Sequence, residues 1–237
     1  MNETIMHDRL AALTAAEDRA LALLDAIEAA GLIAPGRTER EIEKDIYVMA
    51  ERDFGVAVHW HKRIVRAGIN TLSVFAENPP VLTVQADDVV FVDLGPVFED
   101  SKTGGWEADV GRTYAIGSDP RKVALVRDLG VIFDVTAAHF KAHADITGAA
   151  LFAFAVAESE KRGWRFAGEI AGHIVAEFPH ALVPGEKMHG HIRPENPTRL
   201  RNPDGLGRER HWILEIHLAA PDGTFGGFYE RLIDPRR

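Results

Sequence analysis

The chain has 237 residues, of which 46% are hydrophobic, so it is long enough to bury a continuous core. It contains no cysteine, which excludes disulfide bonds and zinc–thiolate sites. The net charge of -9 argues against nucleic acid or an anionic membrane as a partner, and the longest apolar run, Ala149–Ala157, is too short to span a bilayer. Because the first residues also lack the basic-then-apolar pattern of a signal peptide, we expect a soluble cytoplasmic protein.

The first half of the chain predicts two helices followed by strands. Apolar residues recur at helical spacing from about Ala15 to Ala30, and residues 1–14 are expected to form a flexible or helical extension. Thr38 opens a second helix, in which Glu41 completes a capping box, and Gly55 ends it. Alternating or uniformly apolar runs then predict strands, at Val56–His59, Ile64–Ala67, Val81–Val84, Val89–Leu94 and Val110–Ile116.

The same order of elements recurs in the second half. Helices are predicted over residues 119–143 and 147–163, and strand-like segments follow. Thr147 follows Thr38 by 109 residues, so the pattern of helix, break, helix and strands occurs twice. An internal duplication would give two α/β halves that face each other across a central site.

The end of the chain predicts a loop and a strand pair. The polar segment Glu195–Arg210 is rich in Pro, Gly and Arg, which is typical of an exposed loop. Trp212–Leu218 and Phe225–Leu232 are expected to pair in antiparallel fashion. No Pro/Gly/Ser-rich linker divides the sequence, so a single domain over residues 1–237 is expected.

Four acidic residues and one histidine lie in or beside the predicted strands and turns. They are Asp93, Asp109, His173, Glu215 and Glu230. Each has an ordinary alternative, because an aspartate often caps a turn and a lone histidine often belongs to the core. Together they suit two divalent cations: hard oxygens dominate, four carboxylates balance two dications, and a single nitrogen admits Mn, Co, Fe or Zn. A two-metal hydrolytic centre is the leading hypothesis.

The position of Glu215 in its strand sharpens this hypothesis. In the run WILEIHL, Leu214 and Ile216 share one face, so Glu215 and His217 point to the other. If that face is buried, an ionised carboxylate there needs a partner or a metal. If it faces solvent, Glu215 and Glu230 are ordinary surface residues.

The ordered set resembles the M24 metallopeptidases, the family of methionine aminopeptidase, prolidase and aminopeptidase P. The resembling motifs are VDLGPVFED, EADVGRTYAIG, AGHIVAEFPH, WILEIHL and GFYERLI, and the resemblance runs from about Ala15 to the C-terminus. It implies the α+β pita-bread fold, with two pseudo-symmetric α/β halves around a central metal site. The N-terminal domain of prolidases is absent from this sequence, so the expected architecture is closer to a lone methionine aminopeptidase catalytic domain.

The resemblance also implies which residues hold the metals. Asp93 and Asp109 would each contact metal, Asp109 and Glu230 would bridge two ions, and His173 and Glu215 would complete one of them. Mn is preferred, with Co, Zn and Fe as the other possibilities. The expected partners are a short peptide or small amide substrate and, as oligomeric state, a homodimer.

The implied activity is that of an aminopeptidase or an Xaa-Pro peptidase. A water between the two ions would have its pKa lowered and act as the nucleophile. Glu215 would accept its proton and pass it to the leaving amine, and His180 would donate to the developing oxyanion. The alternatives are a hydrolase of non-peptide amide or C–N bonds, a metal-free hydrolase of the creatinase kind, and a non-catalytic binding protein with the same fold.

The chain departs from the family pattern in three places. The family's usual Gly-His-Gly appears as Gly172-His173-Ile174, which would crowd a substrate channel. Asp93 and Asp109 are 16 residues apart, which is longer than usual and predicts an extended hairpin tip at Glu99–Glu107. The stretch Asn70–Ala76 also lacks the histidine with which the family's peptidases are thought to contact the substrate amide.

Two pairs of histidines are candidates to replace the missing one. His59 and His61 alternate with Trp60 in VHWHKRIV, and His189 and His191 lie in KMHGHIRP. Either pair is a candidate for substrate binding, and either is equally compatible with the surface or the edge of the core. The neighbouring segment Lys62-Arg63 would either bind a substrate carboxylate or form a solvated basic turn.

Overall fold

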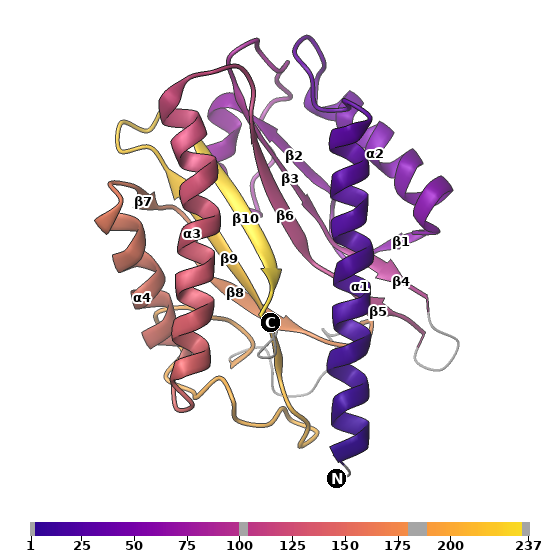
Figure 1. Ribbon diagram of the computed structural model, residues 1–237, viewed down its shortest axis with the longest axis vertical. Helices are drawn as coiled ribbons and strands as arrows, with labels where there is room; N and C mark the ends of the chain where they lie inside the picture. Colours follow the sequence, from indigo (N-terminus) through magenta and orange to yellow (C-terminus); the bar gives the residue numbers. More distant parts are fainter. Residues whose placement is uncertain (1–2, 100–103, 180–188, 234–237) are drawn as a thin grey trace.

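The computed structural model describes residues 3–99, 104–179 and 189–233 (Figure 1). The helices are α1 (Glu3–Ala29), α2 (Glu39–Phe54), the 3-10 helix η1 (Gly68–Leu72), α3 (Pro120–Ala142) and α4 (Gly148–Lys161). The strands are β1 (Val58–His59), β2 (Ile64–Ala67), β3 (Val89–Leu94), β4 (Pro96–Phe98), β5 (Trp106–Glu107), β6 (Val110–Ala115), β7 (Arg165–Phe166), β8 (Gly172–Val175), β9 (His211–Ala219) and β10 (Gly226–Leu232).

Local signals in the sequence fix the ends of three helices. The Thr38 hydroxyl accepts a hydrogen bond from the Glu41 backbone N–H at 3.2 Å, and the Glu41 carboxylate accepts one from the Thr38 N–H at 2.8 Å. Gly55 ends α2 with a φ of 66°. The side chains of Asp119 and Thr147 cap α3 and α4. These three helices therefore begin where the sequence predicted.

Helix α1 is much longer than its periodicity predicted. It begins at Glu3, so a start near Ala15 was wrong, and the expected extension is helical from that residue on. Leu10 and Leu13 are buried in an apolar cluster with residues of three strands, which are Val175, Ile213 and Leu232. Packing against the end of the sheet stabilises these first turns, and that packing is not visible in the local pattern.

The strand predicted at Val81–Val84 is also wrong. This segment makes one isolated bridge, between Thr83 and Thr38, in place of a ladder. The Leu82 backbone N–H donates to a carboxylate oxygen of Glu39 at 3.0 Å, so a side chain supplies the partner that a neighbouring strand would otherwise supply.

Among the described residues, seven strands form one sheet in the order β2-β3-β6-β10-β9-β7, with β8 also pairing with β9. All of its pairs are antiparallel, and the predicted pairing of β9 with β10 is confirmed. β1, β4 and β5 form a separate three-stranded sheet. The pairing of β4 with β5 forms the hairpin predicted near Glu99, although its tip at residues 100–103 lies outside the described residues.

The helices cover one face of the large sheet in two groups. Helices α1 and α2 pack against β2, β3 and β6 through one apolar cluster, which includes Leu23, Ile42 and Val92. Helices α3 and α4 pack against β9 and its neighbours through a second cluster, which includes Leu129 and Leu214. Both α1 and α3 run across the same face (Figure 1). The predicted α+β arrangement of two helix-covered halves is confirmed.

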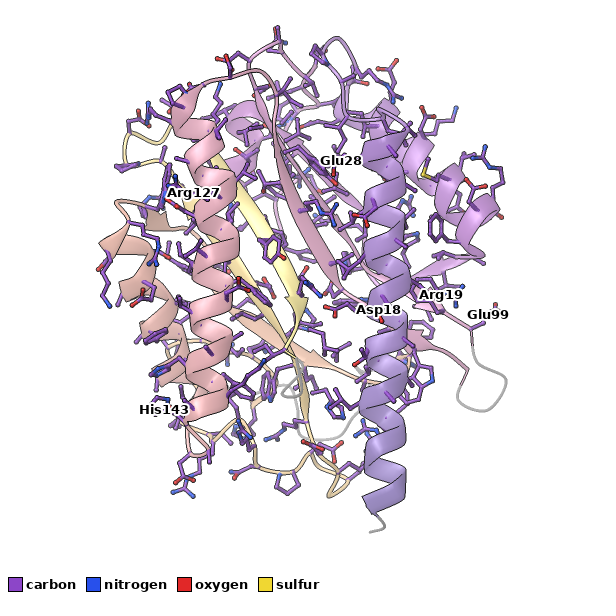
Figure 2. All side chains as sticks on the ribbon, in the orientation of Figure 1. Asp18, Arg19, Glu28, Glu99, Arg127 and His143 are labelled. Atoms are coloured by element: carbon purple, nitrogen blue, oxygen red, sulfur yellow. The ribbon has the colours of Figure 1, made fainter. Side chains whose placement is uncertain are left out.

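The outer sides of these helices are polar. Exposed charged side chains such as Asp18 on α1 and Arg127 on α3 lie on the outer sides, whereas Glu28 of α1 contacts Arg112 of β6 at 3.4 Å (Figure 2). No helix in the described part of the chain combines the length and the apolar character that crossing a membrane requires. Since helices cover one face of the sheet, its opposite face is the one available for a functional site.

Candidate metal centre

One row of paired residues crosses the uncovered face of the sheet. Ile64 of β2 pairs with Asp93 of β3, Asp93 with Gly111 of β6, Gly111 with Glu230 of β10, and Glu230 with Glu215 of β9. Directly paired residues present their side chains on the same face, so three carboxylates from three strands converge. The antiparallel register brings Asp93 and Glu230 into one row, although they lie 137 positions apart in the sequence.

Gly111 leaves the space in the middle of this row. A Cβ atom at that position would lie 2.6 Å from the Phe228 ring and 3.1 Å from the Glu230 Cβ. Any other residue would therefore push against the neighbouring strand. The glycine keeps the row open between Asp93 and Glu230.

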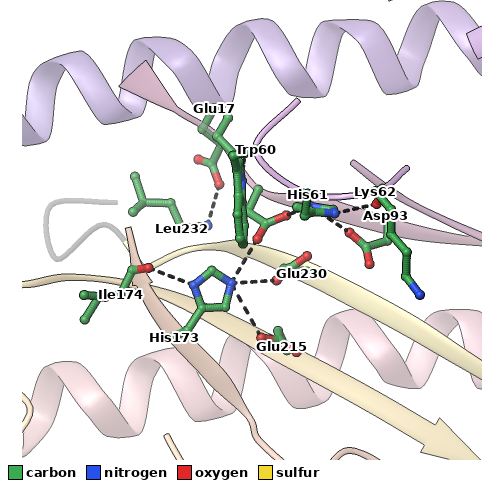
Figure 3. A network of polar contacts seen from close by, with 12 residues as sticks. Glu17, Trp60, His61, Lys62, Asp93, His173, Ile174, Glu215, Glu230 and Leu232 are labelled. Atoms are coloured by element: carbon green, nitrogen blue, oxygen red, sulfur yellow. Dashed lines mark hydrogen bonds and ion pairs between the residues drawn. The ribbon is translucent and has the colours of Figure 1, made fainter. Parts of the chain in front are cut away.

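Asp109 and His173 complete the cluster from the edges of the row. Asp109 lies directly before β6, and its Oδ2 is 2.9 Å from His173 Nε2. The same His173 nitrogen lies 3.7 Å from a carboxylate oxygen of Glu230 and 3.8 Å from one of Glu215 (Figure 3). The structure thus brings all five predicted ligands to one wall of a cavity of about 550 Å³.

His61 lies in the same cluster. Its Nε2 is 3.1 Å from Asp109 Oδ1 and 3.5 Å from Asp93 Oδ1, and its side chain is 5% exposed (Figure 3). Two groups of side chains therefore have donor atoms close enough to hold an ion. They are His61 with Asp93 and Asp109, and His173 with Asp109 and Glu230.

Burial is the largest influence on the acidic groups of this centre. It raises the pKa of Asp93 to about 7 and that of Glu215 to about 8, and it raises the pKa of Glu230 well above its ordinary value. Mutual repulsion of the carboxylates adds to this effect, with Asp109 raising the pKa of each of the other three. Burial and repulsion thus favour the protonated forms of these groups unless cations compensate their charge.

Asp109 and the two histidines are instead stabilised in their charged forms, which lowers the pKa of Asp109 and raises the pKa of each histidine. Burial would raise the pKa of Asp109, but His61 and His173 outweigh it and hold that pKa below its ordinary value. Burial opposes charge on the imidazoles as well. The carboxylates Asp93 and Asp109 nevertheless raise the pKa of His61 to about 9, and hydrogen bonding to Asp109 and Glu230 raises that of His173.

The residues fit divalent cations. Glu230 Oε2 is buried without a hydrogen-bond partner among the described residues, which is costly for a carboxylate oxygen unless a cation contacts it. Four carboxylates and two imidazoles make up the donor set, and this mixture of hard oxygen and nitrogen suits first-row divalent metals.

The fold places the other predicted histidines in different surroundings. His191 lines the cavity, next to β8, where it forms a bridge with His173. The side chain of His59 lies outside the cavity wall, against Tyr47, and burial lowers its pKa to about 4. His189 is exposed, with its Nδ1 2.8 Å from the Thr198 hydroxyl. His180 lies outside the described residues.

The predicted loop at Glu195–Arg210 helps to hold the His191 segment. No helix or regular strand forms there, as expected, but Asn196 and Leu200 are buried. The Asn196 side-chain amide donates to the backbone carbonyl of His191 at 2.7 Å. The loop therefore supports one edge of the cavity.

Several cavity residues were not found from the sequence. Apolar lining comes from Trp60, Phe75, Phe91 and Phe228, and His217 lies beside them. Strand alternation could have predicted three of them. Each lies two residues from a predicted ligand on the same strand and so shares its face, namely Phe91, His217 and Phe228. Trp60 and Phe75 come from irregular segments, where no periodicity fixes the direction of a side chain.

The basic residues near the cavity are also not the ones that the sequence indicated. Lys62 donates to Asn78 and to the Glu77 carbonyl, and Arg63 contacts Glu43, so neither lines the cavity. Arg66 and Arg193 line it instead. Arg66 stands two residues after Ile64 on β2, with its side chain on the face that the cavity occupies.

Comparison with known families agrees with this geometry. The sequence pattern of metallopeptidase family M24 matches residues 11–201, which is most of the chain. The chain belongs to this family. The resemblance to the M24 metallopeptidases that the sequence motifs indicated is confirmed. No curated protein matches the sequence.

Solved structures of M24 proteins share the fold. Prolidase from Thermococcus sibiricus superposes with a TM-score of 0.68 at 21% identity, over 94% of this chain and 55% of that one. Dipeptidase PepE from Mycobacterium ulcerans gives 0.66 at 24%, over 94% and 55%. Methionine aminopeptidase from Thermotoga maritima gives 0.67 at 17%, over 95% and 92%. This chain thus spans little more than half of the prolidase and dipeptidase, and the predicted pita-bread fold is confirmed.

Proposed function

We propose that this M24 protein is a hydrolase that uses two divalent cations to cleave short peptides at their N-terminal end, or a related amide bond. The observation that carries the proposal is the position of Asp109 between two imidazoles. Its Oδ1 faces His61 and its Oδ2 faces His173. The other three carboxylates, Asp93, Glu215 and Glu230, lie close to these two imidazoles. A carboxylate with one oxygen toward each of two donor groups is suited to bridge two ions.

Each protein group has a distinct role in this proposal. Asp109 and Glu230 would help to hold both ions, Asp93 would hold the second ion, and His173 and Glu215 would hold the first. Bound divalent cations polarise a carbonyl oxygen and lower the pKa of a water molecule. Glu215 accepts the proton of the attacking water and transfers it to the leaving amine. His191, from the cavity wall, contacts the substrate.

The cavity favours a small substrate with a free carboxylate. A volume of about 550 Å³ suits a molecule of the size of a short peptide. Arg66 and Arg193 supply positive charge on its wall. Arg66 Nη2 donates to the Glu77 carbonyl at 2.8 Å, whereas its Nε is buried without a hydrogen-bond partner among the described residues. An arginine in that state is suited to a carboxylate, which it binds with two hydrogen bonds. The C-terminal carboxylate of a dipeptide is the proposed partner of Arg66.

A specific feature of the wall supports a second candidate, a hydrolase of a non-peptide amide or C–N bond. The segment Ser73–Ala76 lines the cavity where the family resemblance implies a histidine that contacts the peptide amide. Val74 and Phe75 present apolar side chains there instead. A substrate without a peptide amide would not need that contact.

Metal content and substrate range test the proposal together. Protein purified without chelator should contain two equivalents of metal. Asp109→Asn should retain neither ion at a free-metal concentration that saturates the parent, because it serves both sites. Asp93→Asn is the matched variant and should retain one, because it serves the second site alone. Atomic emission spectroscopy after dialysis gives the numbers.

Activity of the same preparations should be measured on Xaa-Pro, Met-Xaa and non-peptide amide substrates. Cleavage of a dipeptide by the two-metal parent supports the peptidase assignment, and cleavage of the non-peptide amide alone supports the second candidate. Equal metal content in the two aspartate variants would contradict the bridging role of Asp109. A two-metal parent that cleaves none of these substrates would favour a binding protein.

A further inference from the structure

His61 stands in the site in the same way as His173. Each imidazole directs its Nε2 at a different oxygen of Asp109, at 3.1 Å for His61 and 2.9 Å for His173. Each is also close to a further carboxylate, which is Asp93 for His61 and Glu230 for His173 (Figure 3). His173 also has Glu215 at 3.8 Å, but both imidazoles approach Asp109 in the same manner.

The contact that Nδ1 makes in each ring determines which nitrogen carries the lone pair. His61 Nδ1 lies 2.6 Å from the Lys62 carbonyl oxygen, and His173 Nδ1 lies 2.7 Å from that of Ile174. A carbonyl oxygen only accepts hydrogen bonds, so Nδ1 carries the hydrogen in both rings. In the neutral ring the lone pair therefore lies on Nε2, which is the arrangement of a metal-binding histidine whose other nitrogen is anchored.

Packing holds His61 in this position independently of the carboxylates. A Cβ atom on Gly95 would lie 2.2 Å from His61 Cδ2 and 2.5 Å from Trp60 Nε1, so only glycine admits both side chains. The Trp60 indole N–H donates to the Ala108 carbonyl at 3.2 Å. The indole contacts both imidazoles edge-on, with ring centroids 4.4 Å from His61 and 5.3 Å from His173.

The spacing of the donor atoms also suits a shared ion. Two donors that each lie about 2.1 Å from one ion, at angles between octahedral and tetrahedral, are roughly 3.0 to 3.4 Å apart. His61 Nε2 lies 3.1 Å from the Asp109 oxygen, within this range, and 3.5 Å from the Asp93 oxygen, just beyond it.

We infer that His61 is a sixth metal ligand, which with Asp93 and Asp109 holds the second ion, so that each ion receives one imidazole. The inference rests on the proposed two-metal centre and adds a ligand to it. It replaces the substrate-binding role that the sequence suggested for His61. A nitrogen donor at the second ion shifts the preference of that position from Mn toward Co, Zn and Ni.

Metal titration separates the two roles of His61. Metal-free protein is titrated with Co²⁺ and, separately, with Mn²⁺, and bound metal and the visible Co²⁺ spectrum are recorded for the parent, His61→Gln and His59→Gln. His59 is the matched control because it lies two residues away, outside the cavity wall. A substrate-binding His61 would leave metal content unchanged in all three.

The expected result is two equivalents in the parent and in His59→Gln. In His61→Gln, the second equivalent of Co²⁺ should bind at least about 100-fold more weakly, since loss of even an outer-shell partner costs 10- to 100-fold. The second equivalent of Mn²⁺ should weaken less, because Mn²⁺ gains less from nitrogen. Two equivalents of Co²⁺ with the parent's affinity and spectrum in His61→Gln would overturn the inference.

A measurement on the parent alone keeps the test independent of the variant's folding. With ¹⁵N-labelled histidine and two equivalents of Zn²⁺, two Nε2 resonances should move to metal-bound positions. A parent that binds two ions while a single Nε2 moves would overturn the sixth ligand and leave the two-metal centre standing. A parent that binds fewer than two ions would overturn both.

Discussion

Asp109 is the residue on which the charges of the centre depend. It is 2% exposed, yet its pKa lies below the ordinary value because two imidazoles flank it. Asp93, also buried, has a raised pKa of about 7, although His61 faces it as well. The two aspartates occupy the same wall and differ in their number of close histidine contacts. A carboxylate that stays ionised without metal is the natural first point of attachment for a cation.

The arginine on β2 yields a prediction about substrate recognition. Arg66→Met should raise the KM for a dipeptide with a free carboxylate by roughly 10- to 100-fold, since a hydrogen bond to a charged group contributes about 1.5 to 3 kcal/mol. The kcat should not change, because Arg66 is proposed to bind substrate away from the reacting bond. Steady-state kinetics on a dipeptide and on its C-terminal amide measures the effect.

The control is Arg63→Met, whose guanidinium contacts Glu43 and Tyr47 away from the cavity. It should leave both substrates unaffected. If Arg66→Met raised the KM for the amide as much as for the free dipeptide, a general packing effect would replace the proposed carboxylate contact.

At the scale of the elements, alternation along strands explains what the sequence could predict. The pattern around Glu215 placed it with His217, opposite Leu214 and Ile216, and the structure has this arrangement. The face that carries Glu215 lines the cavity, so the alternative of a solvent-facing strand is wrong. The register that aligns Asp93 with Glu230 through Gly111 depends on tertiary pairing, and no local pattern encodes it.

His61 shows why the rest of the site could not be predicted. Alternation suggested that His59 and His61 share one face, but the strand β1 ends at His59. Beyond that point the backbone turns, so the two imidazoles have different surroundings. The close approach of the Gly95 backbone to His61 leaves no room for a Cβ atom and joins segments 34 residues apart. This approach is visible only in the folded chain.

The junction between β3 and β4 yields a second prediction. Gly95→Ala should destabilise the protein by about 1–3 kcal/mol, because the new methyl group would overlap the side chains of Trp60 and His61. Displacement of His61 should also weaken the second metal equivalent. Urea unfolding in the presence of chelator measures the first effect, and Co²⁺ titration measures the second.

Gly130→Ala is the matched control for this substitution. Gly130 lies within α3, and a Cβ there would have no neighbour within 4 Å. Alanine should therefore stabilise the protein by about 0.5–1 kcal/mol, through its higher helix propensity. Similar unfolding curves for the two variants would show that the space at Gly95 is less restricted than the contacts indicate.

At the scale of the whole molecule, the repeated order of elements corresponds to two helix-covered halves of one sheet. Each half supplies part of the centre: Asp93 and Asp109 come from the first, and His173, Glu215 and Glu230 from the second. The pairing of β6 with β10 joins the halves at the row of ligands. The cations are therefore proposed to sit where the two halves meet, and their binding should stabilise the whole fold.

This arrangement predicts how stability depends on pH without metal. The folded-state pKa values of Asp93, Glu215 and His61 are about 7, 8 and 9, each above the ordinary value. A group with a raised folded pKa contributes stability that is fully present below its unfolded pKa and is lost as pH rises through the folded one. These groups should therefore make the free energy of unfolding in chelator fall between about pH 4 and pH 9, by about 1.4 kcal/mol for each pKa unit of difference. His59, whose pKa is lowered to about 4, opposes this fall below about pH 6.5.

Metal should reverse this trend, because the cations bind deprotonated ligands and stabilise the folded state more as pH rises. Urea unfolding at pH 5, 7 and 9, with chelator and with Zn²⁺, tests both slopes. Glu215→Gln in chelator removes one of the raised groups, so its stability should fall less steeply between about pH 4.5 and pH 8 than that of the parent. Parallel curves for the two proteins, or a metal-free parent that becomes more stable toward pH 9, would contradict the electrostatics described for the centre.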